Sequence, residues 1–122
     1  MKIAVSLPAA DMERARAWYA SILKLEPSEI TENGDAWYEI EGTRMLLYAS
    51  RFAGTNQATD AAVEVDDAEA TVAELKARGA TFEPYDFGEE FRTVDGILTT
   101  PDGQKLAWLK DSEGNILGIG SE

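Results

Sequence analysis

The sequence contains no histidine and no cysteine. The absence of cysteine excludes a disulfide framework, a thiolate nucleophile and a zinc–thiolate site. The absence of histidine removes the side chain that most often acts as a general base or as a metal ligand near neutral pH. No serine lies in a G-x-S-x-G motif, and no glycine-rich phosphate-binding loop is visible. The familiar nucleophile–base pairs are therefore excluded.

Basic residues and long hydrophobic runs are also scarce. The chain has 11 Lys and Arg against 23 Asp and Glu, so its formal net charge is −12 at pH 7. Such a field repels nucleic acid and anionic lipid surfaces, and we expect neither as a partner. The opening "MKIAVSLPAAD" holds one lysine and a short apolar run interrupted by Ser6 and Pro8, and no later segment approaches a membrane-spanning length. We therefore expect a cytoplasmic protein.

Length and composition are those of an ordinary globular domain. The chain has 122 residues, of which 44% are hydrophobic and 28% are charged. These values favour a folded chain with a real core and are unlike those of disordered or fibrous sequences. We predict a single domain, residues 1–122, although two very small packed modules also fit this length.

The first half, about residues 1–55, predicts a strand, a helix and two or three further strands. Residues 2–7 are apolar and β-compatible, and Pro8 is expected to end this strand. Asp11 is the predicted N-cap of a helix. Its apolar face, at helical spacing, carries Met12, Ala15, Tyr19, Ile22 and Leu23. The segments "AWYEIEG" and "TRMLLYAS" predict neighbouring strands joined at Glu41-Gly42, and residues 29–31 are a further candidate.

The second half, about residues 58–122, shows the same order of elements. "AAVEV" predicts a strand, and Asp66 with Glu69 three residues later predicts the capping box of a helix from about Asp67. Gly79 is well placed as the C′ residue of that helix. "GILTT", "QKLAWLK" and "NILGIG" predict three more strands, separated by strong turn sequences.

The two halves resemble each other in sequence as well as in pattern. "AADMERARAWYASILKLEP" aligns with "VDDAEATVAELKARGATFEP", and both segments end in Glu-Pro. A period near half the chain indicates two copies of one unit, each too small to cover its own sheet face. We therefore expect the two units to pair, within one chain or between chains.

These two segments, together with the closing "DSEGNILGI", resemble the glyoxalase, bleomycin resistance protein and extradiol dioxygenase superfamily, the vicinal oxygen chelate proteins. The resemblance covers nearly the whole chain. It implies an α+β fold in which two βαβββ modules form a curled mixed sheet, a half-open cup with the helices outside. It also implies that the site lies in the cup and that the cup is commonly completed in a homodimer.

In the metal-dependent members of that family, histidines and glutamates on inward-facing strands hold one divalent ion. The resemblance places these slots at Ala4, at Asp60, near Leu47 or Tyr48, and at Gly118. Only Asp60 carries an ordinary ligand atom, and one carboxylate holds a divalent ion weakly. We therefore predict no metal and no other cofactor. The alternative is an all-oxygen site for Mg²⁺ or Mn²⁺ built from Asp60, Glu64 and Glu39.

Aromatic and acidic strand residues are the candidate ligand-binding set. Because side chains alternate along a strand, Trp37 shares a face with Glu39, while Tyr38 takes the opposite face. A tryptophan beside carboxylates suits a flat or cationic molecule, although Trp37 equally fits a partly exposed strand residue without function. Trp108 fits either face of its strand. The predicted set is Trp37, Glu39, Tyr48, Asp60, Glu64 and Trp108.

Three functions fit these observations. The first is a metal-free protein that binds a small molecule in the cup, similar in plan to the antibiotic-sequestering members of the superfamily. The second is a lyase, isomerase or dioxygenase that uses a carboxylate metal site or acid–base catalysis through Asp60 and Glu64. The third is a dimeric interaction partner whose cup is occluded. We predict the first and expect a homodimer.

Overall fold

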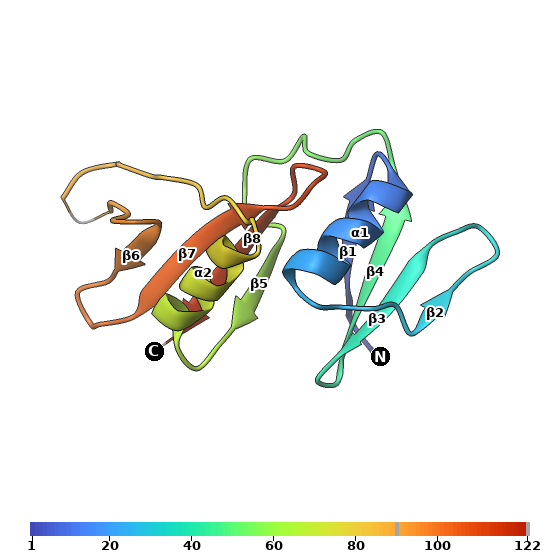
Figure 1. The fold of residues 1–122 in the computed structure, drawn as a ribbon, viewed down its shortest axis with the longest axis horizontal. Helices are drawn as coiled ribbons and strands as arrows, with labels where there is room; N and C mark the ends of the chain where they lie inside the picture. Colours follow the sequence, from blue (N-terminus) through green and yellow to red (C-terminus); the bar gives the residue numbers. More distant parts are fainter. Residues whose placement is uncertain (90, 122) are drawn as a thin grey trace. The chain divides into compact units, whose positions relative to one another are not determined.

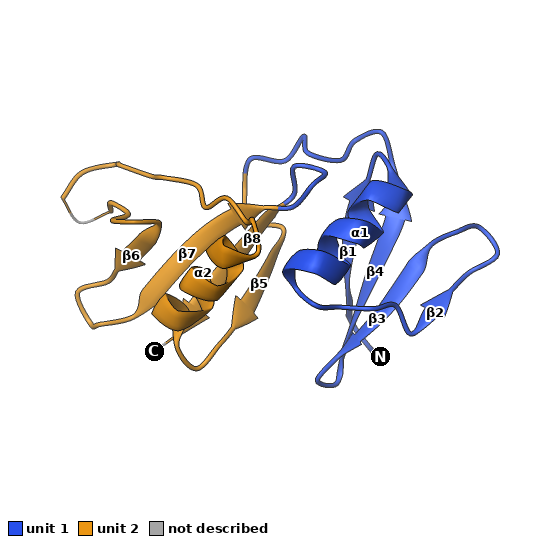
Figure 2. Cartoon of the chain, in the orientation of Figure 1, with its two compact units in different colours: residues 1–57, 111–115 blue, residues 58–110, 116–122 orange. Residues whose placement is uncertain are grey.

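The computed structural model describes residues 1–89 and 91–121 and consists of two compact units (Figures 1 and 2). Unit 1 comprises residues 1–57 and 111–115, and unit 2 comprises residues 58–110 and 116–122. The sequence repeat predicted modules of about residues 1–55 and 58–122, and unit 2 begins at residue 58. The loop of residues 111–115, which connects two strands of unit 2, belongs to unit 1, and the repeat did not indicate this. That the two units form one domain remains a prediction.

Unit 1 is a four-stranded sheet with one helix. The sheet order is β1-β4-β3-β2, with β1 parallel to β4 and the other pairs antiparallel. The elements are β1 (Ala4–Ala9), α1 (Met12–Ile22), β2 (Glu29–Ile30), β3 (Ala36–Ile40) and β4 (Thr43–Ala49). The tight connection between β3 and β4 places Glu41 and Gly42 at φ values of 44° and 85°, as a type I′ hairpin turn requires.

Unit 2 repeats this topology. Its sheet order is β5-β8-β7-β6, with β5 parallel to β8 and the other pairs antiparallel. The elements are β5 (Ala61–Glu64), α2 (Ala68–Ala77), β6 (Ile97–Thr99), β7 (Lys105–Lys110) and β8 (Ile116–Ser121). The expected α+β class, with two βαβββ modules and mixed sheets, is thereby confirmed.

Each helix covers one face of its own sheet. In unit 1, Tyr19 of α1 is fully buried, and its ring centroid lies 6.1 Å from that of Tyr38 on β3. In unit 2, α2 packs on β7 and β8 and buries Val72 and Leu75. The sheet residues buried on the same face are Ala107, Leu109, Leu117 and Ile119. Burial of each such side chain stabilises the fold by about 1.5–3 kcal/mol.

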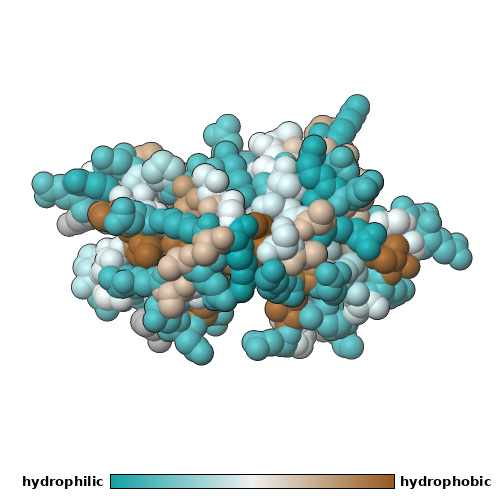
Figure 3. All heavy atoms as spheres, viewed as in Figure 1, coloured by the Kyte–Doolittle hydropathy of each residue, from teal (hydrophilic) through white to brown (hydrophobic). Residues whose placement is uncertain are grey.

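The surface is mainly polar, as the many charged residues require. Figure 3 shows a face on which hydrophilic residues predominate and hydrophobic patches are smaller. No helix in the described part of the chain is long and apolar enough to cross a lipid bilayer.

Pro8 was predicted to end the first strand, but it lies within β1. β1 is the edge strand of its sheet and pairs only with β4. The carbonyl of Pro8 accepts a hydrogen bond from Asn115 Nδ2 at 2.8 Å, so this residue turns its backbone away from β4. A missing N–H on the outer side of an edge strand breaks no ladder hydrogen bond, and proline is therefore tolerated.

The second helix also begins differently from the prediction. Asp67 and not Asp66 is the N-cap of α2, and its carboxylate accepts a hydrogen bond from the backbone N–H of Ala70. Asp11 has the equivalent role for α1, as predicted. The two aspartates at 66 and 67 are chemically equal, and the extended backbone at Asp67 decides which one caps. Gly79 follows α2 at φ 104°, the left-handed conformation expected at C′.

The cap can be tested by substitution. Asp67→Ala is expected to lower the free energy of unfolding by about 1 kcal/mol, because one N-terminal backbone N–H of α2 loses its acceptor. Asp66→Ala, an equal charge change at the neighbouring exposed residue, should alter it by less than about 0.5 kcal/mol. Urea unfolding followed by circular dichroism measures both variants, and equal losses would contradict the assignment.

Candidate ligand site

A hollow of ≈ 760 Å³ lies on the open face of the unit 2 sheet, opposite α2. This volume is in the range of small-molecule sites. Its lining comes from β5, β7, β8 and the adjoining turns: Thr59, Ala62, Val63, Glu64, Val65, Asp66, Gln104, Leu106, Trp108, Gly118, Ile119, Gly120 and Ser121.

The floor of the hollow is the central strand β8, which presents Gly118 and Gly120 on this face. Because side chains alternate, Leu117 and Ile119 point to the helix side and are buried, while Gly118 and Gly120 place only hydrogen atoms on the open side. The side chains next to the two glycines, which rise from the neighbouring strands, are Ala62, Glu64, Leu106 and Trp108. The sheet therefore forms a trough along β8.

Trp108 leans over the first of these glycines. A Cβ atom built on Gly118 would lie 3.6 Å from Trp108 Nε1 and 3.4 Å from Thr59 Cγ2, so the indole lies within van der Waals distance of this position. Trp108 therefore belongs to the open face, which settles the orientation that the sequence left undecided. Part of its surface covers the glycine backbone and part lines the hollow.

Charged groups at the hollow are all acidic. Glu64 and Asp66 line it, and no lysine or arginine is among the described residues of the lining. The neutral polar groups are Thr59, Gln104 and Ser121. An anion would meet only carboxylates here, whereas a cation would be attracted by both of them.

Asp60 has a structural partner at the edge of this region. Its Oδ2 accepts a hydrogen bond from the backbone N–H of Ile116 at 3.0 Å, and its own N–H donates to the carbonyl of Ile116 at 2.8 Å. Asp60 thus closes the first rung between β5 and β8, and it is not among the residues that line the hollow. This role explains an aspartate at the start of β5 without a ligand.

The other three predicted residues lie in unit 1, on the sheet face opposite α1. Arg44 lies over Trp37, with its Cζ atom 3.9 Å from the ring centroid, and its Nε lies 3.2 Å from Glu39 Oε1. A cation of the protein itself therefore occupies the position that we predicted for a cationic ligand. Tyr48 is half-buried on β4. A role for Trp37, Glu39 and Tyr48 in binding stays a prediction.

The donor set does not fit the metal ion that the superfamily resemblance implies. Ala4 and Gly118 offer no ligand atom, and Asp60 accepts the hydrogen bond just described. Within residues 1–89 and 91–121, no group of three or more Asp, Glu, His or Cys side chains could hold a metal ion. The proposed all-oxygen alternative also uses Glu39, which is paired with Arg44.

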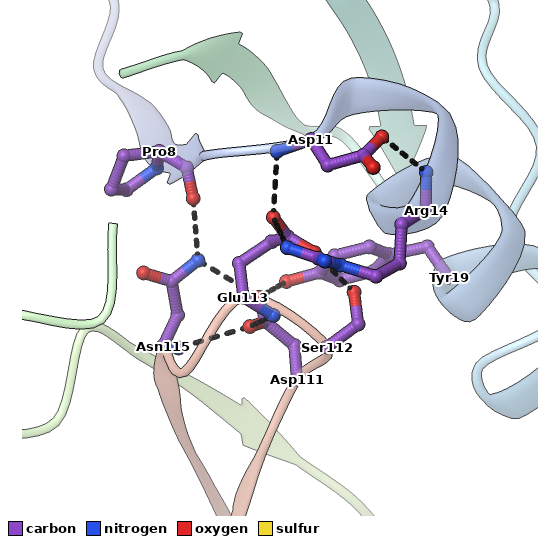
Figure 4. A network of polar contacts seen from close by, with 8 residues as sticks. All are labelled: Pro8, Asp11, Arg14, Tyr19, Asp111, Ser112, Glu113 and Asn115. Carbon is purple, nitrogen blue, oxygen red and sulfur yellow. Dashed lines mark hydrogen bonds and ion pairs between the residues drawn. The ribbon is translucent and has the colours of Figure 1, made fainter. Parts of the chain in front are cut away.

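A second group of polar side chains is buried in unit 1 around the loop of residues 111–115 (Figure 4). Asp111 Oδ1 accepts from the backbone N–H groups of Glu113 and Asn115, at 2.8 and 2.9 Å. Its Oδ2 accepts from the Tyr19 hydroxyl at 2.6 Å and from Asn115 Nδ2 at 2.9 Å. Both oxygens of Asp111 are therefore saturated within the fold.

Both carboxylate oxygens of Glu113 also accept hydrogen bonds from the chain (Figure 4). Arg14 donates to it in bidentate fashion, with Nε 2.8 Å from Oε2 and Nη2 2.9 Å from Oε1. The backbone N–H of Asp11 and the hydroxyl of Ser112 donate at 2.9 and 2.7 Å. Because every acceptor site is filled by the chain itself, we assign this cluster a structural role, which is to secure the loop to the start of α1.

The chain has clear relatives among known proteins. The model of one protein family matches residues 3–115. The chain belongs to the Glyoxalase/Bleomycin resistance protein/Dioxygenase superfamily. The resemblance inferred from the two repeats and the closing "DSEGNILGI" is thus confirmed. A search of curated protein sequences found no match.

Solved structures of the superfamily share the fold at low sequence identity. A glyoxalase/bleomycin resistance protein from Catenulispora acidiphila DSM 44928 is 20% identical with a TM-score of 0.73, over 100% of this chain and 98% of that one. The lactoylglutathione lyase from Agrobacterium tumefaciens is 18% identical with a TM-score of 0.70, over 99% and 92%. The fosfomycin resistance protein FosX from Listeria monocytogenes is 12% identical with a TM-score of 0.72, over 100% and 90%.

The buried carboxylate of Glu113 makes the folding stability of this superfamily member depend on pH in the acid range. The hydrogen bonds from Arg14 hold the pKa of the Glu113 carboxyl at about 2, below its ordinary 4.5, although burial opposes this shift. The ionised group therefore stabilises the fold above about pH 4.5, and this contribution is lost as the pH falls towards 2.

Glu113→Gln is expected to lower the free energy of unfolding by about 1–3 kcal/mol at pH 7, because Arg14 and the N–H of Asp11 lose a charged acceptor. The difference from the unsubstituted protein should shrink between pH 4.5 and pH 2. Denaturant titrations at several pH values measure it. Glu74→Gln, in the exposed pair with Arg78, is the matched control and should change little at any pH. A loss for Glu113→Gln that stays constant down to pH 2 would contradict this account.

Proposed function

We propose that the protein binds a small cationic molecule in the hollow of unit 2 and does so without a metal ion. The observation that carries the proposal is the trough on β8, where two glycines leave room between Trp108 on one side and Glu64 on the other. Trp108 offers a flat aromatic face for stacking or cation–π attraction. The carboxylates of Glu64 and Asp66 select the sign of the ligand charge.

The magnitudes favour a cation over an anion without requiring tight binding. An exposed carboxylate attracts a unit charge at contact distance by about 1 kcal/mol, and cation–π contact with an exposed ring adds about 0.5–1 kcal/mol. Two carboxylates and one indole therefore discriminate against an anion by a few kcal/mol in total. The protein's net charge of −12 adds a long-range attraction of the same sign.

Sequestration of a toxic small molecule is the biological role that we propose. Superfamily members bind small molecules, and the similar structures include proteins described by bleomycin resistance and fosfomycin resistance. Sequestration needs a binding site and no catalytic group, which suits a chain without histidine or cysteine. The homodimer, the cytoplasmic location and the absence of nucleic acid and membrane partners remain predictions from the sequence.

The alternative function is a lyase, isomerase or dioxygenase of the same superfamily. Such an enzyme needs a metal site or an acid–base pair. The positions that the family uses carry a methyl group at Ala4 and a hydrogen atom at Gly118, and Asp60 already bonds the backbone of β8. We therefore place this alternative second.

Removal of one charge from the hollow tests the proposed function. Glu64→Gln is expected to weaken the binding of an organic cation about five-fold, because one favourable charge–charge interaction is lost. The probes are 9-aminoacridine, which is flat, and tetraethylammonium, which is not, measured by isothermal titration calorimetry. Glu74→Gln removes an equal charge from α2, outside the hollow, and should leave the affinity unchanged. Equal effects of the two substitutions, or no saturable binding of either probe, would falsify the proposal.

Metal analysis and metal removal distinguish the proposed binding function from the alternative enzymatic function. Protein purified without chelators is expected to contain less than about 0.1 equivalent of any divalent metal, because a single carboxylate slot holds such an ion weakly. EDTA or added Mn²⁺ should leave both the melting temperature and the probe affinity unchanged. Elemental analysis and thermal-shift assays provide these measurements. A stoichiometric ion that is lost in Asp60→Ala would support the enzyme instead.

A further inference from the structure

A small hairpin beside the hollow carries three aromatic rings that the sequence prediction did not include. The backbone N–H of Thr93 donates to the carbonyl of Tyr85 at 2.8 Å, and the N–H of Phe87 donates to the carbonyl of Phe91 at 2.8 Å. The Thr93 hydroxyl accepts from the N–H of Tyr85 at 2.9 Å. These bonds define the aromatic hairpin, which consists of residues 85–89 and 91–93 in the described part of the chain.

Alternation along the hairpin separates its side chains by type. Tyr85 and Phe87 lie on one face, and their rings are stacked with centroids 6.0 Å apart. Phe91, paired with Phe87 across the hairpin, brings its ring centroid to 5.7 Å from that of Phe87. Asp86 and Arg92 form the cross-strand pair on the other face, with Oδ1 and Nε 3.7 Å apart. One face of the hairpin therefore gathers three aromatic rings.

Trp108 connects this face to the hollow. The Tyr85 ring meets the Trp108 ring edge-on, with centroids 5.4 Å apart and an interplanar angle of 87°. The Phe91 ring lies 5.9 Å from the Trp108 ring at 34°, which is nearer to parallel. Trp108 also lines the hollow, so the aromatic surface is continuous from the hairpin to the trough on β8.

The hairpin leaves much of this aromatic surface in water. Phe87 is 75% exposed and Phe91 is 41% exposed, although both have ring neighbours. A hairpin that served only to connect α2 with β6 gains nothing from exposed phenyl groups, because their burial is the source of their contribution to folding. Exposed aromatic groups at the edge of a concave site are typical of ligand recognition.

We propose that the aromatic hairpin is one wall of the binding site and that the ligand carries a planar aromatic ring system as well as a cationic group. This inference rests on the function proposed above and adds the shape of the ligand to it. The ring system packs on Phe87, Phe91 and Trp108, while the cationic group lies near Glu64.

The sheet geometry sets the length of such a ligand. In register, Trp108 and Glu64 are two strands apart across the sheet and two residues apart along it. Two strand spacings and two residue rises place their backbones roughly 12 Å apart. The expected ligand therefore has two or three fused rings joined to an amine and spans the trough. A compact cation such as tetraethylammonium reaches the carboxylates or the rings but not both.

Truncation of the hairpin rings tests the inference. Phe87→Ala and Phe91→Ala are each expected to weaken 9-aminoacridine binding about five-fold or more and to leave tetraethylammonium binding unchanged, because only the flat probe stacks on the rings. Phe52→Ala is the matched control, since Phe52 is 61% exposed and lies in unit 1. It should change neither affinity. Melting temperatures identify any variant that fails to fold, and Phe87→Leu then serves as the milder replacement.

The outcomes separate the inference from the function on which it rests. If Glu64→Gln weakens both probes while the hairpin variants bind 9-aminoacridine normally, the aromatic wall is wrong and the cation site stands. If neither probe binds, both proposals fail. The hairpin also offers a surface to a second copy of the chain. If analytical ultracentrifugation shows that Phe87→Ala dissociates an oligomer without any loss of probe affinity, the hairpin is an interface and the inference is overturned.

Discussion

Each sheet of this protein has a single helix, and one helix covers only one of two faces. The residues that alternate towards α1 and α2 make the cores, and Tyr38 and Leu117 are examples. Among the described residues no helix of the same unit covers the opposite faces, so their composition is less constrained by the requirement for a core. Every candidate functional feature described above lies on one of these open faces or at its edge.

The two sheet faces that no helix covers carry different kinds of side chain. In unit 1 the face carries large side chains that satisfy one another, because Arg44 stacks on Trp37 and pairs with Glu39. In unit 2 the corresponding central strand carries glycines, and the carboxylate of Glu64 has no basic neighbour among the described residues of the hollow lining. The same topology therefore gives one open face filled by mutually interacting side chains, in unit 1, and one that contains a hollow, in unit 2. This asymmetry places the candidate site in unit 2.

Much of the fold was predictable from the sequence because its signals are local. Apolar spacing, the capping aspartates and the glycine turns indicated both modules. The structure differs at Pro8, in the choice between Asp66 and Asp67, and in the assignment of the loop of residues 111–115 to unit 1. Pro8 could be placed only when the position of β1 at a sheet edge was known. The cap depends on backbone angles that two adjacent aspartates do not reveal.

The site was less predictable because it depends on contacts between distant segments. Glu64 and Trp108 were in the predicted set, although the sequence left the face of Trp108 undecided, and the glycines between them gain meaning only from the strand register. The aromatic hairpin was missed, although "YDFGEEF" contains a signal in its alternating aromatic residues around a glycine. Nothing in that segment alone shows that its rings meet Trp108. Asp60 was considered only as a possible metal ligand. Its actual partner, the backbone N–H of Ile116, is distant in sequence and could not be identified from the segment around Asp60.

Gly118 bears both on the predicted absence of a metal ion and on the proposed binding site. The superfamily resemblance places a metal-ligand slot at this position, and here the residue has no side chain. The same residue leaves the floor of the trough open beside Trp108, because it carries no side chain on that face. The predicted absence of a metal ion and the proposed cation-binding hollow therefore both depend on one residue, because Gly118 supplies neither a ligand atom nor a side chain that would occupy the trough.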